Sequence, residues 1–313
     1  MLVVLREDQT FEDDLFTNFH KYVGSGDCLV LNNTRVFPAR LRGRRKNEAG
    51  AAVEIFLVRA LDESENVWSV LAKPGKRVRA GEKIFFAARL SAEVLSEGEY
   101  GERVVRFIAD EPTVDLLDAL GQTPLPPYIH REPDASDRDR YQTVFAERRG
   151  SIAAPTAGLH FTPDMLEKCR QRGAEIAYLT LHVGLGTFAH IRAGNLSEIR
   201  LHEEYFEISE PNADIMRRAK RLLCVGTTSV RTVETAMLRG GLKAMNGETN
   251  LSVHPGFHFR GTGALLTNFH LPQSSLLMLV CAFGGRDLTL RAYRHAVAER
   301  YRFFSYGDCM LMV

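Results

Sequence analysis

Cysteine is scarce in this chain of 313 residues, and its placement argues against two classes of site. The five cysteines are odd in number and widely spread, and no two of them form a CxxC pair. A disulfide framework needs an even, regularly spaced set, and a zinc knuckle needs closely paired ligands. The sequence therefore predicts neither of them, and we expect no metal. The cysteines are Cys28, Cys169, Cys224, Cys281 and Cys309.

Long apolar runs and a strong net charge are missing as well. No stretch approaches the roughly 20 apolar residues that span a bilayer. The start, MLVVLREDQT, has neither the basic segment nor the long apolar core of a secretion signal, so we expect a cytoplasmic protein. The formal net charge of +1 predicts no partner by itself. It hides local contrast, because RLRGRRK (40–46) and KPGKRVR (73–79) are strongly basic.

The hydrophobic content is 45%, enough for a sizeable core, and the length predicts about two domains. Residues 50–110 contain short apolar bursts separated by turn sequences such as KPGK and EGEYGE, a spacing typical of β-hairpins. We predict a small antiparallel β-barrel at 37–124. It is inserted into an α/β domain made of 1–36 and 125–313, where strands and helices alternate. Such sheets bind ligands in a cleft at the strand ends.

Polar or small residues stand at four places where predicted strands give way to turns or helices. SIAAPTAGLHFT (151–162) is a poor helix interior because of Pro155 and Gly158, so it predicts a loop beside a ligand. His160 then lies just before a helix that Thr162 caps. We expect all four junctions to meet in one cleft. The other three are LHVGLG (181–186), VGTTSVRTVE (225–234) and TNFH (267–270).

Each of these features also has a purely structural explanation. A glycine pair such as Gly184 and Gly186 is more often a simple turn, because the dinucleotide fingerprint needs GxGxxG. The hydroxyls of 227–229 are equally good helix caps, and a basic run such as 40–46 is more often a solvated face. The apolar stretch LLMLVCAF is interpreted as core. Their joint occurrence beside such turns favours a site for His160, His182, His202, Glu204 and His270.

Eight longer motifs occur in one order from near residue 1 to the C-terminus. They are LVLNNTRVFPARLRG (29–43), DRYQTVFA (139–146), AAPTAGLHF (153–161), LHVGLGTF (181–188), HEEYFEI (202–208), VGTTSVRTVET (225–235), TNFHLPQSSLLMLV (267–280) and YRFFSYGDCML (301–311). Together they resemble the S-adenosylmethionine:tRNA ribosyltransferase-isomerase family of queuosine biosynthesis. The resemblance implies an α/β domain with an inserted β-barrel, which agrees with the pattern of strands above.

The resemblance also implies a reaction. The ribosyl group of S-adenosylmethionine is transferred to 7-aminomethyl-7-deazaguanine at the tRNA wobble position, giving epoxyqueuosine and releasing adenine and methionine. A sulfonium acidifies the neighbouring carbon, so such a site needs a base near neutral pKa. Departing adenine needs a proton or hydrogen bonds, and the methionine carboxylate needs cationic or N–H donors. Arg231 and residues 227–229 can supply these donors.

Individual residues follow from these arguments. The favoured base is His160, because the helix N-terminus beside it keeps the imidazole neutral, and the alternative is Glu204 paired with His202. The catalytic candidates are His160, Glu204, His202, His182 and His270. The candidates for binding S-adenosylmethionine are Thr156, Ala157, Gly158, Gly184, Gly186, Thr227, Thr228, Ser229, Arg231 and Asn268. The candidates for binding tRNA are Arg40, Arg42, Arg44, Arg45, Lys46, Lys73, Lys76, Arg77 and Arg79. We expect a monomer.

This chain departs from the family pattern in places. Family members usually begin with a further segment before the first strand, whereas this chain starts at MLVVL, so we expect any wall built by that segment to be absent. His254 replaces a usual tyrosine, and Leu185 a smaller residue. Two alternatives therefore stay open, a tRNA-binding homologue with weak catalysis and a conventional methyltransferase. The second is disfavoured because no glycine-rich motif follows the first strand.

Overall fold

The computed structural model describes residues 1–47, 49–62, 64–87, 90–110, 113–126, 128–129, 131–184 and 201–313. Contacts divide the chain into two compact units, Met1–Arg35 with Gln142–Val313, and Val36–Tyr141. The second unit extends beyond the predicted insertion, 37–124. It does so because residues after 124 return to the first barrel strand, where Glu132 forms an ion pair with Arg42.

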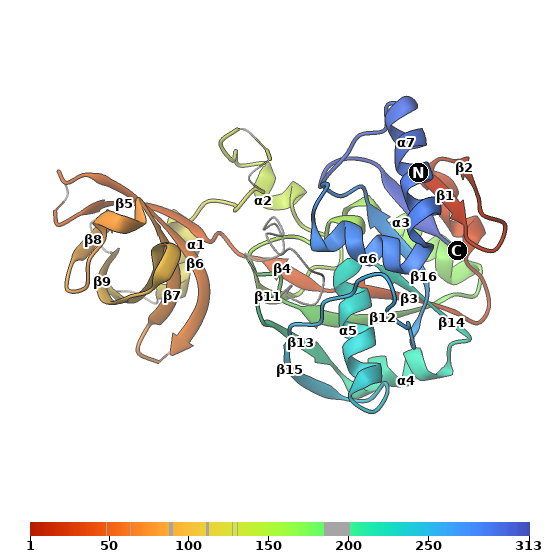
Figure 1. Cartoon of the computed structure of the whole chain (residues 1–313). Helices are drawn as coiled ribbons and strands as arrows, with labels where there is room; N and C mark the ends of the chain where they lie inside the picture. The colour runs from red at the N-terminus through yellow and green to blue at the C-terminus, as the bar shows by residue number, and fades with distance from the viewer. Residues whose placement is uncertain are drawn as a thin grey trace. The chain divides into compact units, whose positions relative to one another are not determined.

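A nine-stranded mixed sheet forms the centre of the first unit (Figure 1). Its strands are β1 (Leu2–Leu5), β2 (Thr10–Asp13), β3 (Asp27–Asn32), β12 (Glu175–Leu181), β13 (Glu204–Ile208), β14 (Arg221–Val225), β15 (Met245–Thr249), β16 (Thr262–Asn268) and β17 (Cys309–Met312). Their order is β15-β13-β12-β3-β14-β16-β17-β1-β2. β12, β3, β14 and β16 are mutually parallel, so their carboxyl ends lie at one edge of the sheet. β4 (Thr34–Val36) and β11 (Arg148–Ser151) form a separate pair.

Helices cover both faces of this sheet, because its central strands are apolar on both sides. In β3, Cys28 and Val30 pack with α4, α5, α6 and α7, while Leu29 and Leu31 pack with η1 and α3. Burying each such aliphatic side chain contributes about 1.5–3 kcal/mol. None of the helices in the described part of the chain is long and apolar enough to span a membrane. The helices are η1 (Phe16–Tyr22), η4 (Thr156–His160), α3 (Pro163–Gln171), α4 (Glu210–Arg218), α5 (Thr227–Leu238), α6 (Ser275–Gly284) and α7 (Arg286–Ala298).

The second unit contains a closed antiparallel barrel of six strands in the order β10-β7-β6-β5-β8-β9. They are β5 (Arg40–Arg45), β6 (Ala52–Asp62), β7 (Val67–Lys73), β8 (Lys83–Ala87), β9 (Leu90–Glu97) and β10 (Glu102–Ala109), joined by η2 (Gly75–Arg77) and η3 (Glu99–Gly101) and followed by α1 (Thr113–Leu120) and α2 (Asp137–Arg140). Val53, Ile55 and Leu57 of β6 alternate into the interior. The predicted fold class, an α/β domain with an antiparallel barrel, is confirmed.

A buried arginine organises one end of this barrel. Arg103 on β10 is only 5% exposed. Its Nε donates to the Val78 carbonyl at 2.7 Å and its Nη2 to the Gly75 carbonyl at 2.5 Å. Its Nη1 donates to the carbonyls of Gly98 and Glu102. Backbone oxygens thus satisfy every nitrogen of the guanidinium, and the bond to Gly75 fixes the start of η2.

Candidate active site

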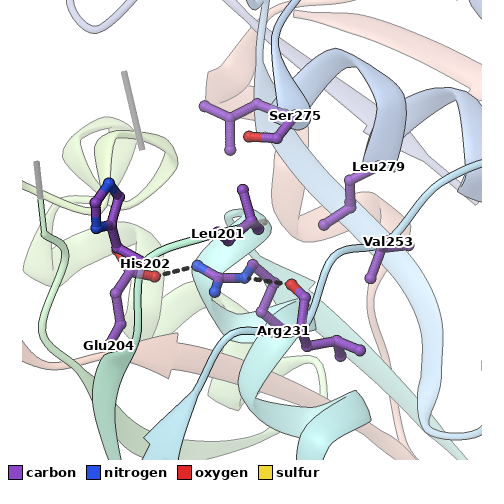
Figure 2. Close-up of a pocket in the computed structure, with 9 residues that line it drawn as sticks. Leu201, His202, Glu204, Arg231, Val253, Ser275 and Leu279 are labelled. Atoms are coloured by element: carbon purple, nitrogen blue, oxygen red, sulfur yellow. Dashed lines mark hydrogen bonds and ion pairs between the residues drawn. The ribbon is translucent and has the colours of Figure 1, made fainter. Parts of the chain in front are cut away.

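A pocket in the first unit lies between β13, α5 and α6 (Figure 2). Its cavity volume is about 20 Å³, room for about one water molecule. Three residues predicted from the sequence, His202, Glu204 and Arg231, line it together with Ser275. The rest of the wall is apolar and consists of Leu201, Leu251, Val253, Leu276 and Leu279. The pocket therefore combines an aliphatic wall with one arginine and one carboxylate.

Arg231 is the cation of this pocket and is 6% exposed. Its Nη1 pairs with Glu204 Oε2, and its Nε donates to the Leu251 carbonyl at 3.0 Å (Figure 2). Glu204 also accepts a hydrogen bond from the Gly184 N–H at 2.8 Å. Arg231 Nη2 is buried and has no hydrogen-bond partner within the described residues. Leaving a buried donor unsatisfied costs about 1–3 kcal/mol, more if it is charged, which indicates a ligand.

The amino end of α5 lies at the sheet edge where β14 and β16 end. Gly226 precedes it with φ 88° and ψ 153°, a conformation open essentially only to glycine, and no side chain caps the helix. Thr228 Oγ1 and Asn268 Oδ1 are both buried, again without a partner in the part of the chain that is described. Thr228 and Arg231 are three residues apart, so they share one face of α5 about 5 Å apart along its axis.

His160 reaches this same edge from η4. Asn268 Nδ2 donates to His160 Nε2 at 3.4 Å, and Phe16 packs against the imidazole with ring centroids 5.3 Å apart. Burial lowers the pKa of His160 to about 4. The imidazole is therefore neutral at pH 7, as expected, but for a different reason. Desolvation causes the shift, whereas the helix N-terminus beside it is already capped by Thr162, whose Oγ1 accepts from the Met165 N–H.

The small residues of the 151–162 stretch are explained by packing within the protein. A Cβ on Gly158 would lie 2.8 Å from side-chain atoms of both Thr143 and Phe145. Ala157 is buried, and its Cβ lies 3.8 Å from the position a Cβ on Gly226 would take. Thr143 and Phe145 therefore explain why residue 158 is glycine, and the binding of S-adenosylmethionine by Ala157 and Gly158 stays a prediction.

Two further histidines occupy separate surroundings. His182 Nδ1 lies 2.7 Å from Thr34 Oγ1, and its ring stacks on Tyr205 at 5.6 Å. Tyr205 follows Glu204 on β13 and so points to the opposite face, which places His182 on the other side of the strand from the pocket. His270 Nε2 lies 2.8 Å from Thr267 Oγ1, just beyond β16. Burial lowers the pKa of both histidines to about 4. His182 therefore lies beside β13 without lining the pocket, and its place in one common cleft stays a prediction.

A family model described as "Queuosine biosynthesis protein" matches residues 1–312. The chain belongs to this family. It is 51% identical over 328 aligned positions to an S-adenosylmethionine:tRNA ribosyltransferase-isomerase of Solibacter usitatus, covering 100% of this chain and 92% of the relative. The crystal structure of an S-adenosylmethionine tRNA ribosyltransferase from Thermotoga maritima matches with a TM-score of 0.54 and 36% identity. That match covers 100% of this chain and 91% of the other. The predicted family is confirmed.

The remaining predicted ligand contacts of this queuosine-family chain differ in their surroundings. Thr227, Thr228 and Ser229 form the first turn of α5 and not a separate turn. Ser229 Oγ donates to the Val225 carbonyl at 2.9 Å, so its hydroxyl is used within the protein. Thr156 begins η4 and is half-buried. Gly186 lies outside the described residues.

Sequence reasoning missed the apolar part of the pocket. Leu251 and Val253 follow β15, and Leu276 and Leu279 belong to the stretch that was interpreted as core. One face of α6 does pack into the core, but Ser275, Leu276 and Leu279 also line the pocket. One signal in the sequence could have pointed to this wall. Ser274 caps α6, since its Oγ accepts from the Leu277 N–H, and so it marks the start of the helix that lines the pocket.

The barrel neutralises part of its own positive charge. Arg45 makes two hydrogen bonds to Glu82 at 2.7 and 2.9 Å. Arg40, Arg42 and Arg79 face Glu54, Glu132 and Glu97. The other five predicted tRNA contacts are exposed and form no ion pair with any described residue, and they are Arg44, Lys46, Lys73, Lys76 and Arg77. No group of three His, Cys, Asp or Glu able to hold a metal occurs among the described residues.

Proposed function

We propose that this chain is an S-adenosylmethionine:tRNA ribosyltransferase-isomerase. It transfers the ribosyl group of S-adenosylmethionine to 7-aminomethyl-7-deazaguanine at the tRNA wobble position, forms epoxyqueuosine and releases adenine and methionine. Within a chain of this family, the observation that carries the proposal is a set of buried polar atoms without partners among the described residues, namely Thr228 Oγ1, Arg231 Nη2 and Asn268 Oδ1. A bound ligand would supply the hydrogen bonds that they lack.

His160 is the proposed base. The lone pair of its neutral imidazole is on Nε2, where Asn268 donates only a long hydrogen bond of 3.4 Å. That bond must break before Nε2 accepts the proton from the carbon beside the sulfonium. Glu204 suits this role less well, because Arg231 and the Gly184 N–H already occupy its two oxygens. His202, exposed at the mouth of the pocket, and His270 are proposed to assist proton transfer, whereas His182 lies on the other side of β13.

The adenosine part of the substrate is proposed to lie at the amino end of α5. Thr228 Oγ1 and Asn268 Oδ1 can accept hydrogen bonds, so they suit a ribose hydroxyl or the adenine amino group. The free N–H groups in the first turn of α5 can stabilise the negative charge that develops on departing adenine. Thr227 and Gly184 contribute to this region through the backbone.

The acceptor is proposed to bind through the barrel. Arg44, Lys46, Lys73, Lys76 and Arg77 have no carboxylate partner within the described residues, so phosphates can take that place. The four arginines that pair with glutamates are less available to phosphates. The proposed tRNA contacts are therefore fewer than the nine predicted from the sequence. Several phosphate contacts give a log–log salt slope more negative than about −3. Because tRNA is the acceptor, we propose the cytoplasm as the compartment. We also propose that the chain works as a monomer.

The test is adenine release from S-adenosylmethionine in the presence of tRNA carrying 7-aminomethyl-7-deazaguanine. The control is the same tRNA with guanine at that position, which lacks the accepting amine. We expect adenine and methionine to appear together, and only with the modified tRNA. With methyl-labelled S-adenosylmethionine, the label should stay on methionine. Label in the RNA would instead identify a methyltransferase, and tRNA binding without adenine release would favour the homologue with weak catalysis.

A further inference from the structure

We propose that the pocket between β13, α5 and α6 binds the methionyl end of S-adenosylmethionine, with the α-carboxylate on Arg231 Nη2. This inference rests on the proposed function only in taking S-adenosylmethionine as the ligand. It assigns one half of that molecule to one set of side chains. Arg231 is thereby a binding residue, and Glu204 is a positioning residue that acts through Arg231.

The first argument is the chemistry of the wall. Leu251, Val253, Leu276 and Leu279 line the pocket beside a single guanidinium. The cavity between them is about 20 Å³, room for about one water molecule, so these apolar side chains must move apart to admit the ligand. An aliphatic wall with one cationic edge matches an amino acid that has an apolar side chain and a carboxylate. Methionine, the product released here, has a neutral thioether chain and fits this description. Phosphates and sugars do not, because most of the wall offers no hydrogen bond.

The second argument is the state of the guanidinium. Arg231 Nη1 and Nε are held by Glu204 and by the Leu251 carbonyl, so the plane of the group is fixed from two sides. Of the three guanidinium nitrogens, only Nη2 has no hydrogen-bond partner among the described residues, and Arg231 is itself 6% exposed. A carboxylate oxygen is the strongest partner for such a donor. Glu204 compensates most of the buried charge (Figure 2), which leaves Nη2 as the one nitrogen of this guanidinium without a partner among the described residues.

The third argument is distance along α5. Thr228 and Arg231 share one face of this helix, roughly 5 Å apart along the axis. Thr228 Oγ1 is unpartnered within the described chain and lies 3.5 Å from the position that a Cβ on Gly226 would take, just after β14. An extended ligand with its carboxylate at Arg231 therefore has its next polar part near Thr228. S-adenosylmethionine, with an amino acid joined to a nucleoside through sulfur, has this arrangement.

The test compares S-adenosylmethionine with its decarboxylated analogue, which lacks only the carboxylate. Dissociation constants are measured by calorimetry for the full chain and for Arg231→Gln. The wild-type chain should bind the analogue at least tenfold more weakly. Arg231→Gln should weaken S-adenosylmethionine by a similar factor and leave the analogue within about threefold. Equal affinities of the wild-type chain for both ligands would overturn the assignment, and so would an equal loss of both in the variant.

Two further measurements separate binding from folding and from the proposed function. 5′-Methylthioadenosine, which has no amino acid part, should bind the wild-type chain and Arg231→Gln equally well. Leu276→Trp should fill the pocket and weaken S-adenosylmethionine, whereas the matched control Leu277→Trp, one residue along α6 and outside the lining, should not. If Arg231→Gln does not fold, two measurements still test the assignment. They are the comparison of the two ligands on the wild-type chain and the comparison of Leu276→Trp with Leu277→Trp.

The outcomes also distinguish the two proposals. Adenine release that continues with the decarboxylated analogue, at an unchanged KM, would refute this pocket assignment and leave the proposed function intact. Conversely, tight carboxylate-dependent binding of S-adenosylmethionine without adenine release on modified tRNA would support the pocket and refute the proposed function.

Discussion

Two buried arginines, one in each unit of the molecule, are treated in opposite ways. Arg103 in the barrel donates from all of its nitrogens to backbone carbonyls. Arg231 in the α/β unit is as deeply buried but leaves Nη2 without a partner among the described residues. A satisfied guanidinium stabilises a fold, whereas an unsatisfied one is available to a ligand. The comparison agrees with the proposed division of labour, in which the α/β unit binds S-adenosylmethionine and the barrel presents charge to tRNA.

The largest effect is expected at the strand ends of the α/β unit. His160→Ala removes the proposed base, and turnover should fall about 10³-fold. This corresponds to about 4 kcal/mol of activation free energy. Adenine release at saturating substrates measures this. The control is His258→Ala, an exposed histidine outside the pocket. A loss within about threefold, less than 1 kcal/mol, would contradict the assignment.

The second prediction concerns Arg103, the arginine in the barrel whose hydrogen bonds are all made within the protein. Arg103→Met leaves several carbonyls without donors and should lower the free energy of unfolding of the barrel by about 2–3 kcal/mol. Trp68, the single tryptophan, lies on β7, so its fluorescence in a denaturant titration reports the barrel. Arg106→Met, on the same strand but exposed, is the matched control and should change little. A parallel loss of S-adenosylmethionine affinity would show that the units are not separable in this way.

The units should also differ in their response to acid. Burial lowers the pKa of His160, His182 and His270 to about 4, below the unfolded value near 6.5. Between these values the unfolded state binds more protons, so stability is present above pH 6.5 and is lost as pH falls toward 4. The described barrel residues contain no histidine. The loss should therefore appear in helical circular dichroism and much less in Trp68 fluorescence.

One substitution sharpens that result. His182→Asn should reduce the pH dependence of unfolding in this window by about one proton, or about 1.4 kcal/mol per pH unit. Unfolding free energies at pH 7, 6 and 5 measure the slope. An unchanged slope would mean that His182 titrates normally in the folded chain.

The smallest effect is expected for single cations on the barrel. Lys76→Ala should weaken tRNA binding by about 1 kcal/mol and reduce the magnitude of the salt slope by about 1, with S-adenosylmethionine affinity unchanged. Arg45→Ala is the variant to compare with Lys76→Ala, because the guanidinium of Arg45 is already bound to Glu82. It should alter barrel stability more than the salt slope. The reverse pattern, measured by filter binding at several salt concentrations, would place tRNA on the paired arginines.

The fold was largely accessible from sequence because burial leaves a periodic signal. The continuous apolar run of β3 indicates a strand covered on both faces, and the alternation in β6 indicates a barrel wall. The boundary after the barrel was less accessible. It depends on contacts such as that of Glu132 with Arg42 on β5, which leave no pattern in the local sequence.

The site was only partly accessible, because side-chain direction and pairing depend on tertiary contacts. His182 and Glu204 both adjoin predicted turns, yet Tyr205 places His182 on the opposite face of β13. Gly158 helped to predict a loop beside a ligand, whereas packing against Thr143 and Phe145 already requires glycine there. Arg45 belongs to a basic run, but a glutamate distant in sequence neutralises it. Residue types thus predicted a polar strand-end site, and only the fold distinguishes its members.

The parallel pairing of β1 with β17 has a consequence for how the protein is made. Leu2 pairs with Met310 and Val4 with Met312, and β17 also separates β1 from β16. On the ribosome, β1 therefore emerges long before β17, its inner neighbour, exists. The strands of the barrel pair only with one another and emerge well before that point. We expect the barrel to fold during translation and the large sheet to close only after residue 312 has left the exit tunnel.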